Sequence, residues 1–253
     1  MIAKDLKKYP NKKLHFVDMT KYDLDQFPDL AYWSTSMYSR YFIPKIVPDL
    51  EKAIYLDVDI IVKKDIKDLY NQDMENHPIA AMEESRHYTP TIVRRLRKIW
   101  PTYAGQYFNS GVLLLDIQKL IAMNFTNQAI QMTLSMKHVL EFPDQDILNI
   151  LFENNVKSLD CFFNLFASMI PVLKQNHQEI PLSEPTIIHY AAGKPWKENS
   201  PFQEDFEDVL KTSVFYKRII AKYRSKKISK FYLFGFIPLF TRVVPKDPSF
   251  FMK

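Results

Sequence analysis

Two acidic residues, separated by a single position, interrupt an otherwise apolar stretch. They are Asp57 and Asp59 in AIYLDVDIIV, residues 53–62. Residues i and i+2 of a β-strand point to the same face, so the spacing predicts two neighbouring carboxylates. Carboxylates this close repel each other unless a cation or a proton lies between them, and burying them unpaired is costly. The pair therefore predicts a divalent metal site.

Two other interpretations of the pair stay open. Both aspartates could end a strand, one in water and the other capping a helix. Phosphatase-type sites also place an aspartate, the nucleophile, after an apolar strand. Those sites continue with a flexible turn of the Gly-Thr type, whereas residues 60–64 read IIVKK. The sequence therefore favours metal binding over chemistry through an aspartyl phosphate.

A second polar group, Asn109, Ser110 and Gly111, leads into the apolar segment VLLL. We expect a small turn at a strand boundary, where a glycine lets a ligand approach the backbone closely. The Asn109 amide offers a donor and an acceptor, as a sugar hydroxyl requires. A plain turn explains the same residues equally well.

The segment PDQDILN, residues 143–149, begins a predicted helix. We expect Asp144 to cap this helix, which leaves Gln145 and Asp146 at the helix N-terminus, a place suited to polar ligands. The alternative is that these residues only cap the helix.

A late segment, IIHYAAGKPW, contains the remaining candidates. His189 ends an apolar strand, and an imidazole with two carboxylates is a suitable ligand set for Mn²⁺. Lys194, next to Gly193, is a point charge that suits a phosphate. A lone histidine at a strand end is more often structural, so the interpretation depends on the other motifs.

Short apolar runs alternate with helix-like spacing along the chain, which predicts an α/β sandwich on a mainly parallel sheet. In such sheets ligands bind beyond the carboxyl ends of the strands. The strands are predicted at 14–17, 53–62, 79–82, 112–115 and 186–190. The helices are predicted at 33–48, 90–100, 117–138, 144–154 and 204–224.

The composition limits the cellular compartments and the classes of binding partner that we expect for this protein. The single cysteine, Cys161, excludes an internal disulfide, and we find neither a secretory signal nor an apolar run that could span a bilayer. We therefore expect a cytoplasmic protein. The net charge of +5 favours anionic partners such as nucleotides, nucleic acid or acidic lipid. No nucleic-acid-binding motif accompanies the charge, which argues against nucleic acid.

The C-terminal part differs in composition. Five cationic residues crowd between Lys222 and Lys230, and the aromatic segment FYLFGFIPLF, residues 231–240, follows. Lysines beside aromatics suit an anionic lipid interface, so we predict a tail at 221–253 that associates with a membrane and a main domain at 1–220. Alternatively, the aromatics pack on the domain and leave the lysines in water.

Together and in this order, these segments resemble family 8 of the retaining glycosyltransferases, over about residues 13 to 200. The matching segments are SMYSRYFIPKIVP (36–48), YLDVD (55–59), FNSGVLLLD (108–116), DQDILN (144–149) and HYAAGKPW (189–196). The resemblance implies a GT-A fold, a UDP-galactose or UDP-glucose donor, and a glycan or glycolipid acceptor of the cell surface.

The resemblance also implies roles for individual residues. Mn²⁺, with Mg²⁺ as the alternative, is held by Asp57, Asp59 and His189 and offsets the charge of the departing UDP. Donor binding is implied for Arg40, Asp57, Val58, Asn109, Ser110, Asp144, Gln145, His189, Gly193 and Lys194. Catalytic roles fall to Asp144, bonded to the donor sugar, and to Gln145, beside the anomeric carbon. Glu84 stands where the family has an acidic residue.

The chain departs from the family in two respects. The family opens with a strand and loop that bind uridine, whereas only residues 1–56 precede the acidic pair here. We therefore expect an N-terminally incomplete donor pocket, and a catalytically silent remnant or a membrane-associated UDP-binding module is the alternative function. The loop after His189 has alanine at 191 and 192, where the family often has an earlier glycine and one more residue.

Overall fold

The computed structural model describes residues 13–28, 34–84, 91–166, 170, 185–191, 195, 201–212, 230–233 and 237–241. The chain forms two compact units. One unit is Tyr22–Gly193, and the other combines Met1–Lys21 with Lys194–Lys253. The boundaries between these units lie at residues 21/22 and 193/194, not at residue 220. The predicted domain boundary at residue 220 stays a prediction.

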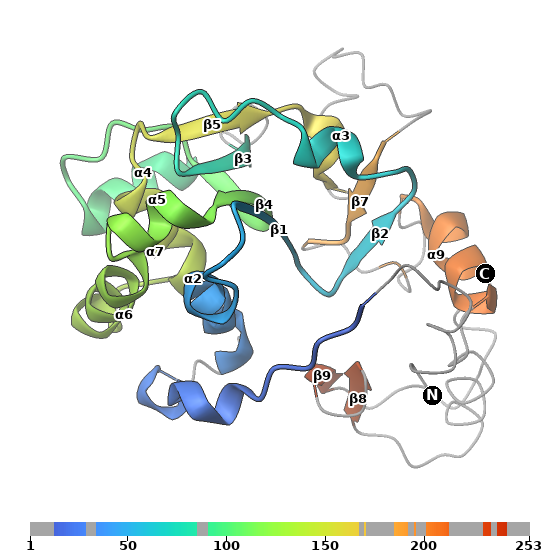
Figure 1. Cartoon of the computed structure of the whole chain (residues 1–253), viewed down its shortest axis with the longest axis horizontal. Helices are drawn as coiled ribbons and strands as arrows, with labels where there is room; N and C mark the ends of the chain where they lie inside the picture. The colour runs from blue at the N-terminus through green and yellow to red at the C-terminus, as the bar shows by residue number, and fades with distance from the viewer. Residues whose placement is uncertain are drawn as a thin grey trace. The chain divides into compact units, whose positions relative to one another are not determined.

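The larger unit is built on a four-stranded sheet with the strand order β1-β4-β3-β5 (Figure 1). Its strands are β1 (Lys52–Leu56), β3 (Ile79–Glu83), β4 (Phe108–Asp116) and β5 (Val156–Leu159). The long strand β4 runs antiparallel to both β1 and β3, while β3 and β5 are parallel. Because β4 is paired on both edges and buried along nearly its whole length, it is the central support of the site.

A second, three-stranded sheet has the order β2-β7-β6. It contains β2 (Ile60–Val62), β6 (Leu165–Phe166) and β7 (Ile187–His189). Strands β2 and β7 are antiparallel, with Ile60 opposite His189, and β6 is parallel to β7. Because β1 and β2 belong to different sheets, the residues between them, 57–59, lie where the two sheets meet.

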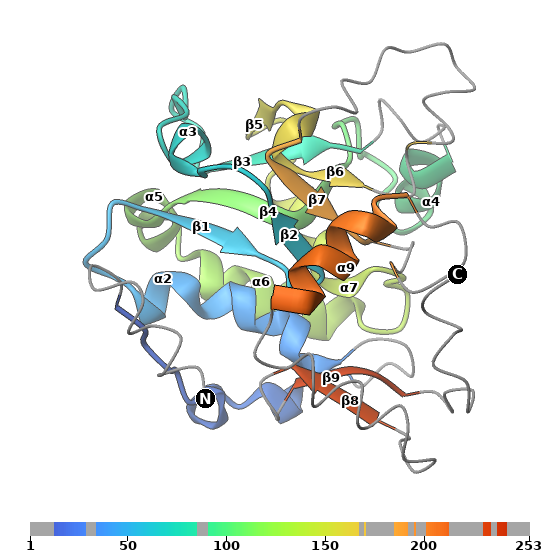
Figure 2. The ribbon, with the colours of Figure 1, turned by 90° about the vertical axis from the view of Figure 1, so that its right-hand side faces the viewer.

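Helices cover the larger sheet. Figure 2 shows α2, α6 and α7 along one face of the sheet that contains β1 and β4. The α-helices that the structure describes in full in this unit are α2 (Ile43–Ile46), α3 (Lys67–Tyr70), α4 (Thr91–Ile99), α5 (Ile117–Ala122), α6 (Phe125–Met136) and α7 (Pro143–Leu151). The described 3₁₀ helices of this unit are η2 (Leu24–Gln26), η3 (Thr35–Phe42) and η4 (Cys161–Phe163), and a further one, η1 (Met19–Tyr22), ends at the first residue of the unit.

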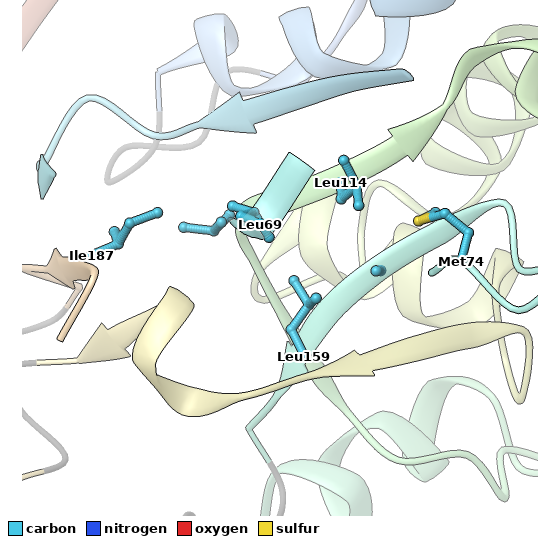
Figure 3. Close-up of a cluster of buried hydrophobic side chains, with 7 residues drawn as sticks. Leu69, Met74, Leu114, Leu159 and Ile187 are labelled. Atoms are coloured by element: carbon cyan, nitrogen blue, oxygen red, sulfur yellow. The ribbon is translucent and has the colours of Figure 1, made fainter. Parts of the chain in front are cut away.

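An apolar cluster joins the two sheets (Figure 3). Leu114 of β4 and Leu159, which ends β5, belong to the same buried cluster as Ile187 of β7. Full burial of a side chain of this size stabilises a fold by about 1.5–3 kcal/mol. The cluster therefore fixes the base of β7, the strand that ends in His189, relative to β4.

Aromatic packing holds the 3₁₀ helix η3 against the domain. Phe27 stacks on Tyr38 with ring centroids 4.2 Å apart, and Tyr41 meets Phe125 of α6 edge-on at 6.1 Å. The Tyr41 hydroxyl also lies 3.2 Å from the Thr133 hydroxyl in α6. Since the buried Arg40 stands between the two tyrosines in η3, this packing determines where its guanidinium lies.

The predicted α/β sandwich is confirmed, but the mainly parallel direction of its sheet is wrong for the described strands. Three strand pairs of the larger unit, β1/β4, β3/β4 and β2/β7, are antiparallel, and two, β3/β5 and β6/β7, are parallel. An apolar run indicates that a strand is buried on both faces. Burial does not determine whether the strand is parallel or antiparallel to its neighbours.

Two predicted strands also differ from the structure. The segment 53–62 is not one strand, because β1 ends at Leu56 and β2 begins at Ile60. The segment 14–17 is not in a strand, and its Phe16 side chain is 76% exposed. A short apolar run forms a strand only where a neighbouring strand pairs with it.

In the second unit, the structure describes the helix α9 (Gln203–Thr212) and the antiparallel pair β8 (Lys230–Leu233) and β9 (Ile237–Thr241). The aromatic segment predicted as a tail therefore contains two strands. The cationic residues 222–229 lie outside the described residues. Within the described part of the chain, we find no helix with the length and apolar character needed to cross a membrane.

Candidate functional site

Asp57, Asp59 and His189 converge where the two sheets meet. The Nε2 atom of His189 lies 3.4 Å from Asp59 Oδ1 and 3.9 Å from Asp57 Oδ2. One ligand atom from each of the three side chains lies within 4.8 Å of the others. Two carboxylates and an imidazole are a suitable ligand set for a divalent transition metal. The three residues can therefore hold a metal ion.

Backbone hydrogen bonds set this geometry. The Asp57 N–H donates to the Gly111 carbonyl at 2.8 Å, and the Tyr190 N–H donates to the Asp59 carbonyl at 2.9 Å. One aspartate is thus attached to β4 and the other to the end of β7. The predicted shared strand face is wrong, because the pair lies between β1 and β2, yet both side chains still reach the histidine.

Gly111 makes room for the imidazole of His189. A Cβ atom at position 111 would lie 2.2 Å from His189 Cε1 and 2.9 Å from Nδ1, distances at which one of the groups must move. The predicted turn at 109–111 is wrong, because these residues belong to β4. A glycine does allow a close approach here, and the approaching group is a side chain of the protein itself.

Arg40 is buried and joins the metal group to the polar residues beside it. Its Nη2 donates to Asp57 Oδ1 at 2.8 Å, and its Nη1 lies 2.9 Å from Asp144 Oδ2 and 2.7 Å from the Ser110 carbonyl. Burial alone would lower the pKa of Arg40, but the carboxylates of Asp144 and Asp57 outweigh it and raise this pKa. The guanidinium therefore stays charged and holds both carboxylates in place.

The two oxygens of Asp57 face different partners. Oδ1 accepts hydrogen bonds from Arg40 and from the Tyr55 hydroxyl at 2.6 Å. Oδ2 is the oxygen that faces His189. This division fixes the carboxylate so that one oxygen points to the candidate metal position.

Asp144 and Gln145 project from the first turn of α7. The helix begins at Pro143, so Asp144 is inside the helix and is not the predicted N-cap. Burial raises the pKa of Asp144, and this outweighs the opposite effect of Arg40. Gln145 accepts hydrogen bonds from Asn109 Nδ2 at 2.9 Å and from the Ser110 N–H at 3.0 Å.

Glu84 completes this side of the site. Its Oε2 accepts a hydrogen bond from Gln145 Nε2 at 3.1 Å. Burial raises the pKa of the Glu84 carboxyl, although its hydrogen bonds with Gln145 and Asn109 act in the opposite direction. The residue assigned with the least detail from the sequence thus lies in direct contact with a predicted catalytic residue.

An ion pair beneath the site holds the start of α7. Asp146 is fully buried and accepts two hydrogen bonds from Arg95 of α4, at 2.6 and 2.9 Å, and one from the Tyr107 hydroxyl at 2.6 Å. The backbone N–H groups of Glu141 and Phe142 also donate to it. This network fixes the turn that carries the two preceding residues, Asp144 and Gln145.

The structure brings most of the predicted residues together and leaves some outside its description. The group in mutual contact is Arg40, Asp57, Asp59, Asn109, Ser110, Asp144, Gln145 and His189. Val58 lies between the two aspartates and is 51% exposed. Gly193 and Lys194 lie outside the described residues.

Two residues of the site were missed from the sequence. Tyr55 binds Asp57, and the buried Asn164 accepts a hydrogen bond at Oδ1, 2.9 Å from His189 Nδ1. The signal for Asn164 was its position as a single amide in the apolar run CFFNLF. A buried amide needs partners, but the sequence does not say which.

Comparisons with known proteins point to one protein family. The profile of the family described as Glycosyl transferase family 8 matches residues 2–200. The lipopolysaccharide 1,2-glucosyltransferase of Escherichia coli strain K12 is 28% identical over 235 residues, which are 85% of this chain and 68% of that protein. The lipopolysaccharide 1,3-galactosyltransferase of Salmonella typhimurium strain LT2 is 29% identical over 177 residues, 68% of this chain and 52% of that protein.

Among solved structures, the galactosyltransferase LgtC, in complex with donor and acceptor sugar analogs, superposes with a TM-score of 0.59. It is 23% identical and is matched over 70% of this chain and 66% of its own. At this identity the likeness concerns the fold, and it confirms the expected GT-A-like architecture. The chain spans between about half and two thirds of the length of these three proteins.

Proposed function

The chain belongs to glycosyl transferase family 8, and from this premise we propose that it transfers galactose or glucose from UDP to a glycan or glycolipid. The transfer would retain the configuration at the anomeric carbon. The observation that carries the proposal is the contact between two groups of residues. Arg40 touches both Asp57 of the candidate metal group and Asp144 of the candidate sugar group.

We propose Mn²⁺ as the resident ion, with Mg²⁺ as the alternative. Asp57, Asp59 and His189 would hold it, and the imidazole favours Mn²⁺ because Mg²⁺ prefers oxygen ligands throughout. The ion supplies charge neutralisation to the departing diphosphate. The exposed Val58, together with Gly193 and Lys194, is proposed to contact the UDP part of the donor.

The sugar side of the site is proposed to consist of Asn109, Ser110, Asp144 and Gln145. A carboxylate and amides offer the mixture of acceptors and donors that sugar hydroxyls need. Gln145 Oε1 already accepts hydrogen bonds from the Asn109 amide and from Ser110, and a neutral amide is a weak nucleophile. Both features support a positioning role for Gln145 over a covalent intermediate formed on it.

The acceptor is proposed to be a surface glycan such as lipopolysaccharide or lipooligosaccharide. Two relatives carry the names lipopolysaccharide 1,2-glucosyltransferase and 1,3-galactosyltransferase, which supports an acceptor of this class. We propose that the protein works in the cytoplasm, at the inner face of the membrane, and that the cationic and aromatic segment 222–240 contacts anionic lipid.

The test is the release of UDP from UDP-galactose and from UDP-glucose, with Mn²⁺ and with EDTA. We expect release from one donor that requires the metal. Tight UDP binding with Mn²⁺ but without turnover would instead support the UDP-binding module. A folded protein that neither binds nor cleaves either donor would contradict the proposal.

A further inference from the structure

A continuous row of hydrogen-bonded side chains crosses the site from the metal group to the sugar group. It starts at His189 Nδ1, which lies 2.9 Å from Asn164 Oδ1. Asn164 Nδ2 donates to Asn109 Oδ1 at 2.9 Å, and Asn109 Nδ2 donates to Gln145 Oε1 at 2.9 Å. The row ends where Gln145 Nε2 meets the Glu84 carboxylate at 3.1 Å.

The direction of this row is set by groups whose roles are unambiguous. An amide side chain can be turned over without changing its shape, so its orientation has to follow from its partners. The backbone N–H of Gly111 donates to Asn109 Oδ1 at 2.9 Å, and the backbone N–H of Ser110 donates to Gln145 Oε1 at 3.0 Å. A backbone N–H can only donate, so both amide oxygens are fixed as acceptors.

The orientation of the Asn109 amide determines the orientation of the Asn164 amide. Because Asn109 Oδ1 is an acceptor, the Asn164 atom that faces it has to be the N–H₂ group. The Asn164 carbonyl oxygen is then left to face His189, so His189 Nδ1 has to be the donor. The hydrogen bond at one ring nitrogen determines which nitrogen carries the proton.

We propose that Asn164 is a positioning residue that holds His189 with its proton on Nδ1, so that Nε2 presents a lone pair to the metal position. The same residue links this ligand to Asn109 on the sugar side. Hydrogen bonds from a ligand histidine to such outer partners fix the tautomer and the ring orientation. The inference deepens the proposed function and rests on its metal site.

The surrounding fold supports a positioning role. Asn164 joins η4 to β6 and is completely buried. The next strand residues place Phe166 opposite His189, with the ring centroids 5.3 Å apart in an edge-on contact. The imidazole is thus held by Phe166 and by Asn164, with the space above Gly111 left open for it.

The first experiment measures Mn²⁺ affinity from the electron paramagnetic resonance signal of the free ion. We expect Asn164→Ala to raise the Mn²⁺ dissociation constant roughly 10–100-fold. Asn164→Asp keeps an oxygen for the Nδ1–H and loses the donor to Asn109. We therefore expect it to keep the wild-type Mn²⁺ affinity but to lower the rate of UDP release. Thr133→Val, which removes a buried hydroxyl in α6, is the control for lost stability.

The second experiment needs no metal. Long-range ¹H–¹⁵N correlation spectra distinguish the Nδ1–H tautomer, the Nε2–H tautomer and the doubly protonated ring. The His189 signal is the one that disappears in His189→Gln. We expect the Nδ1–H tautomer in the wild type and in Asn164→Asp, and a larger share of the Nε2–H tautomer in Asn164→Ala.

The outcomes separate this inference from the proposed function. An Nε2–H tautomer in the wild type overturns the inference, whether or not the protein binds Mn²⁺. Equal losses of Mn²⁺ affinity in Asn164→Ala and Asn164→Asp, or no loss in Asn164→Ala, overturn it as well. A wild type that shows the Nδ1–H tautomer but does not bind Mn²⁺ upholds the inference and contradicts the proposed metal site.

Discussion

At the scale of single residues, hydrogen bonds fix the orientation of most side chains in the site. Asp57 shows this most clearly, because Arg40 and Tyr55 engage one of its oxygens and the other faces His189. A ligand held in this way loses little side-chain entropy when an ion binds. The consequences of changing individual atoms can therefore be predicted.

Replacing either aspartate of the metal group should abolish most of the activity. We expect Asp57→Asn and Asp59→Asn each to slow metal-dependent UDP release by at least about 10²-fold, because both carboxylates position the ion. The exposed Asp68→Asn in α3 serves as the control and should be unchanged. Turnover at the wild-type rate in either variant would contradict the metal assignment.

Gly111→Ala should act on His189. The added Cβ would lie 2.2 Å from the imidazole, so either the ring or β4 has to shift. We expect weaker Mn²⁺ binding by calorimetry together with a lower melting temperature. Gly105→Ala is the control for a tight glycine that does not contact the metal group, because its Cβ would meet Glu153 Cγ at 3.1 Å and the Tyr103 hydroxyl at 3.2 Å, and we expect it to lower stability but not Mn²⁺ affinity. An equal loss of affinity in both variants would contradict the steric explanation.

Glu84→Gln should make stability less dependent on pH. Burial raises the pKa of Glu84 above its ordinary value of 4.5, so the folded state disfavours the ionised carboxylate. The stability linked to this group is fully present below pH 4.5 and is lost as the pH rises through the folded-state pKa. We expect the variant to melt above the wild type at neutral pH and this difference to shrink towards pH 4.5. Melting curves over this range measure it, and a difference that does not change with pH would count against it.

At the scale of elements, the important contact lies between α4 and α7. Arg95 and Asp146 form a bidentate ion pair, and the aspartate is completely buried. The pair holds the first turn of α7 from below, while Arg40 holds the same turn from the side of η3. A helix start that carries two site residues is thus fixed by two separate cations.

Removing Arg95 should destabilise the fold. Breaking one partner of a buried ion pair costs about 3 kcal/mol, because the remaining charge stays buried. For a chain of this size, that corresponds to a melting temperature roughly 6–12 °C lower. We expect this for Arg95→Met in thermal unfolding followed by circular dichroism. Arg94→Met, an exposed neighbour on the same helix, should melt like the wild type.

At the scale of the whole molecule, the question is how the protein reaches its acceptor. The cationic residues between Lys222 and Lys230 follow the predicted main domain, residues 1–220, in the sequence, and an aromatic segment comes next. Each cation near an anionic surface contributes about 1 kcal/mol to binding, and salt weakens this contribution. Such a segment would hold the enzyme near a lipid-linked acceptor without a membrane-spanning helix.

Deletion of residues 222–253 should release the protein from membranes while UDP release continues. We expect the full chain to sediment with vesicles that contain phosphatidylserine and to stay in solution with neutral vesicles. The shortened chain should stay in solution with both. Sedimentation that does not change after the deletion would show that another surface binds the lipid.

The sequence by itself determined the α/β class, several of the strands and helices, and most of the residues that meet in the candidate site. Those signals are local, because the periodicity of apolar residues indicates which side chains are buried. The spacing of Asp57 and Asp59 also keeps both carboxylates within reach of one ion, even though β1 ends before Asp57 and β2 begins after Asp59. The order of the motifs was also sufficient to suggest the family, which the comparisons confirmed.

Only the tertiary structure decided the strand directions, the reason for Gly111 and the part played by Asn164. Each depends on a contact between segments that are far apart in the sequence. Gly111 is understood once β7 brings His189 against β4, and Asn164 once β6 is paired beside β7. A single amide in an apolar run shows that a buried partner exists, but only packing identifies that partner.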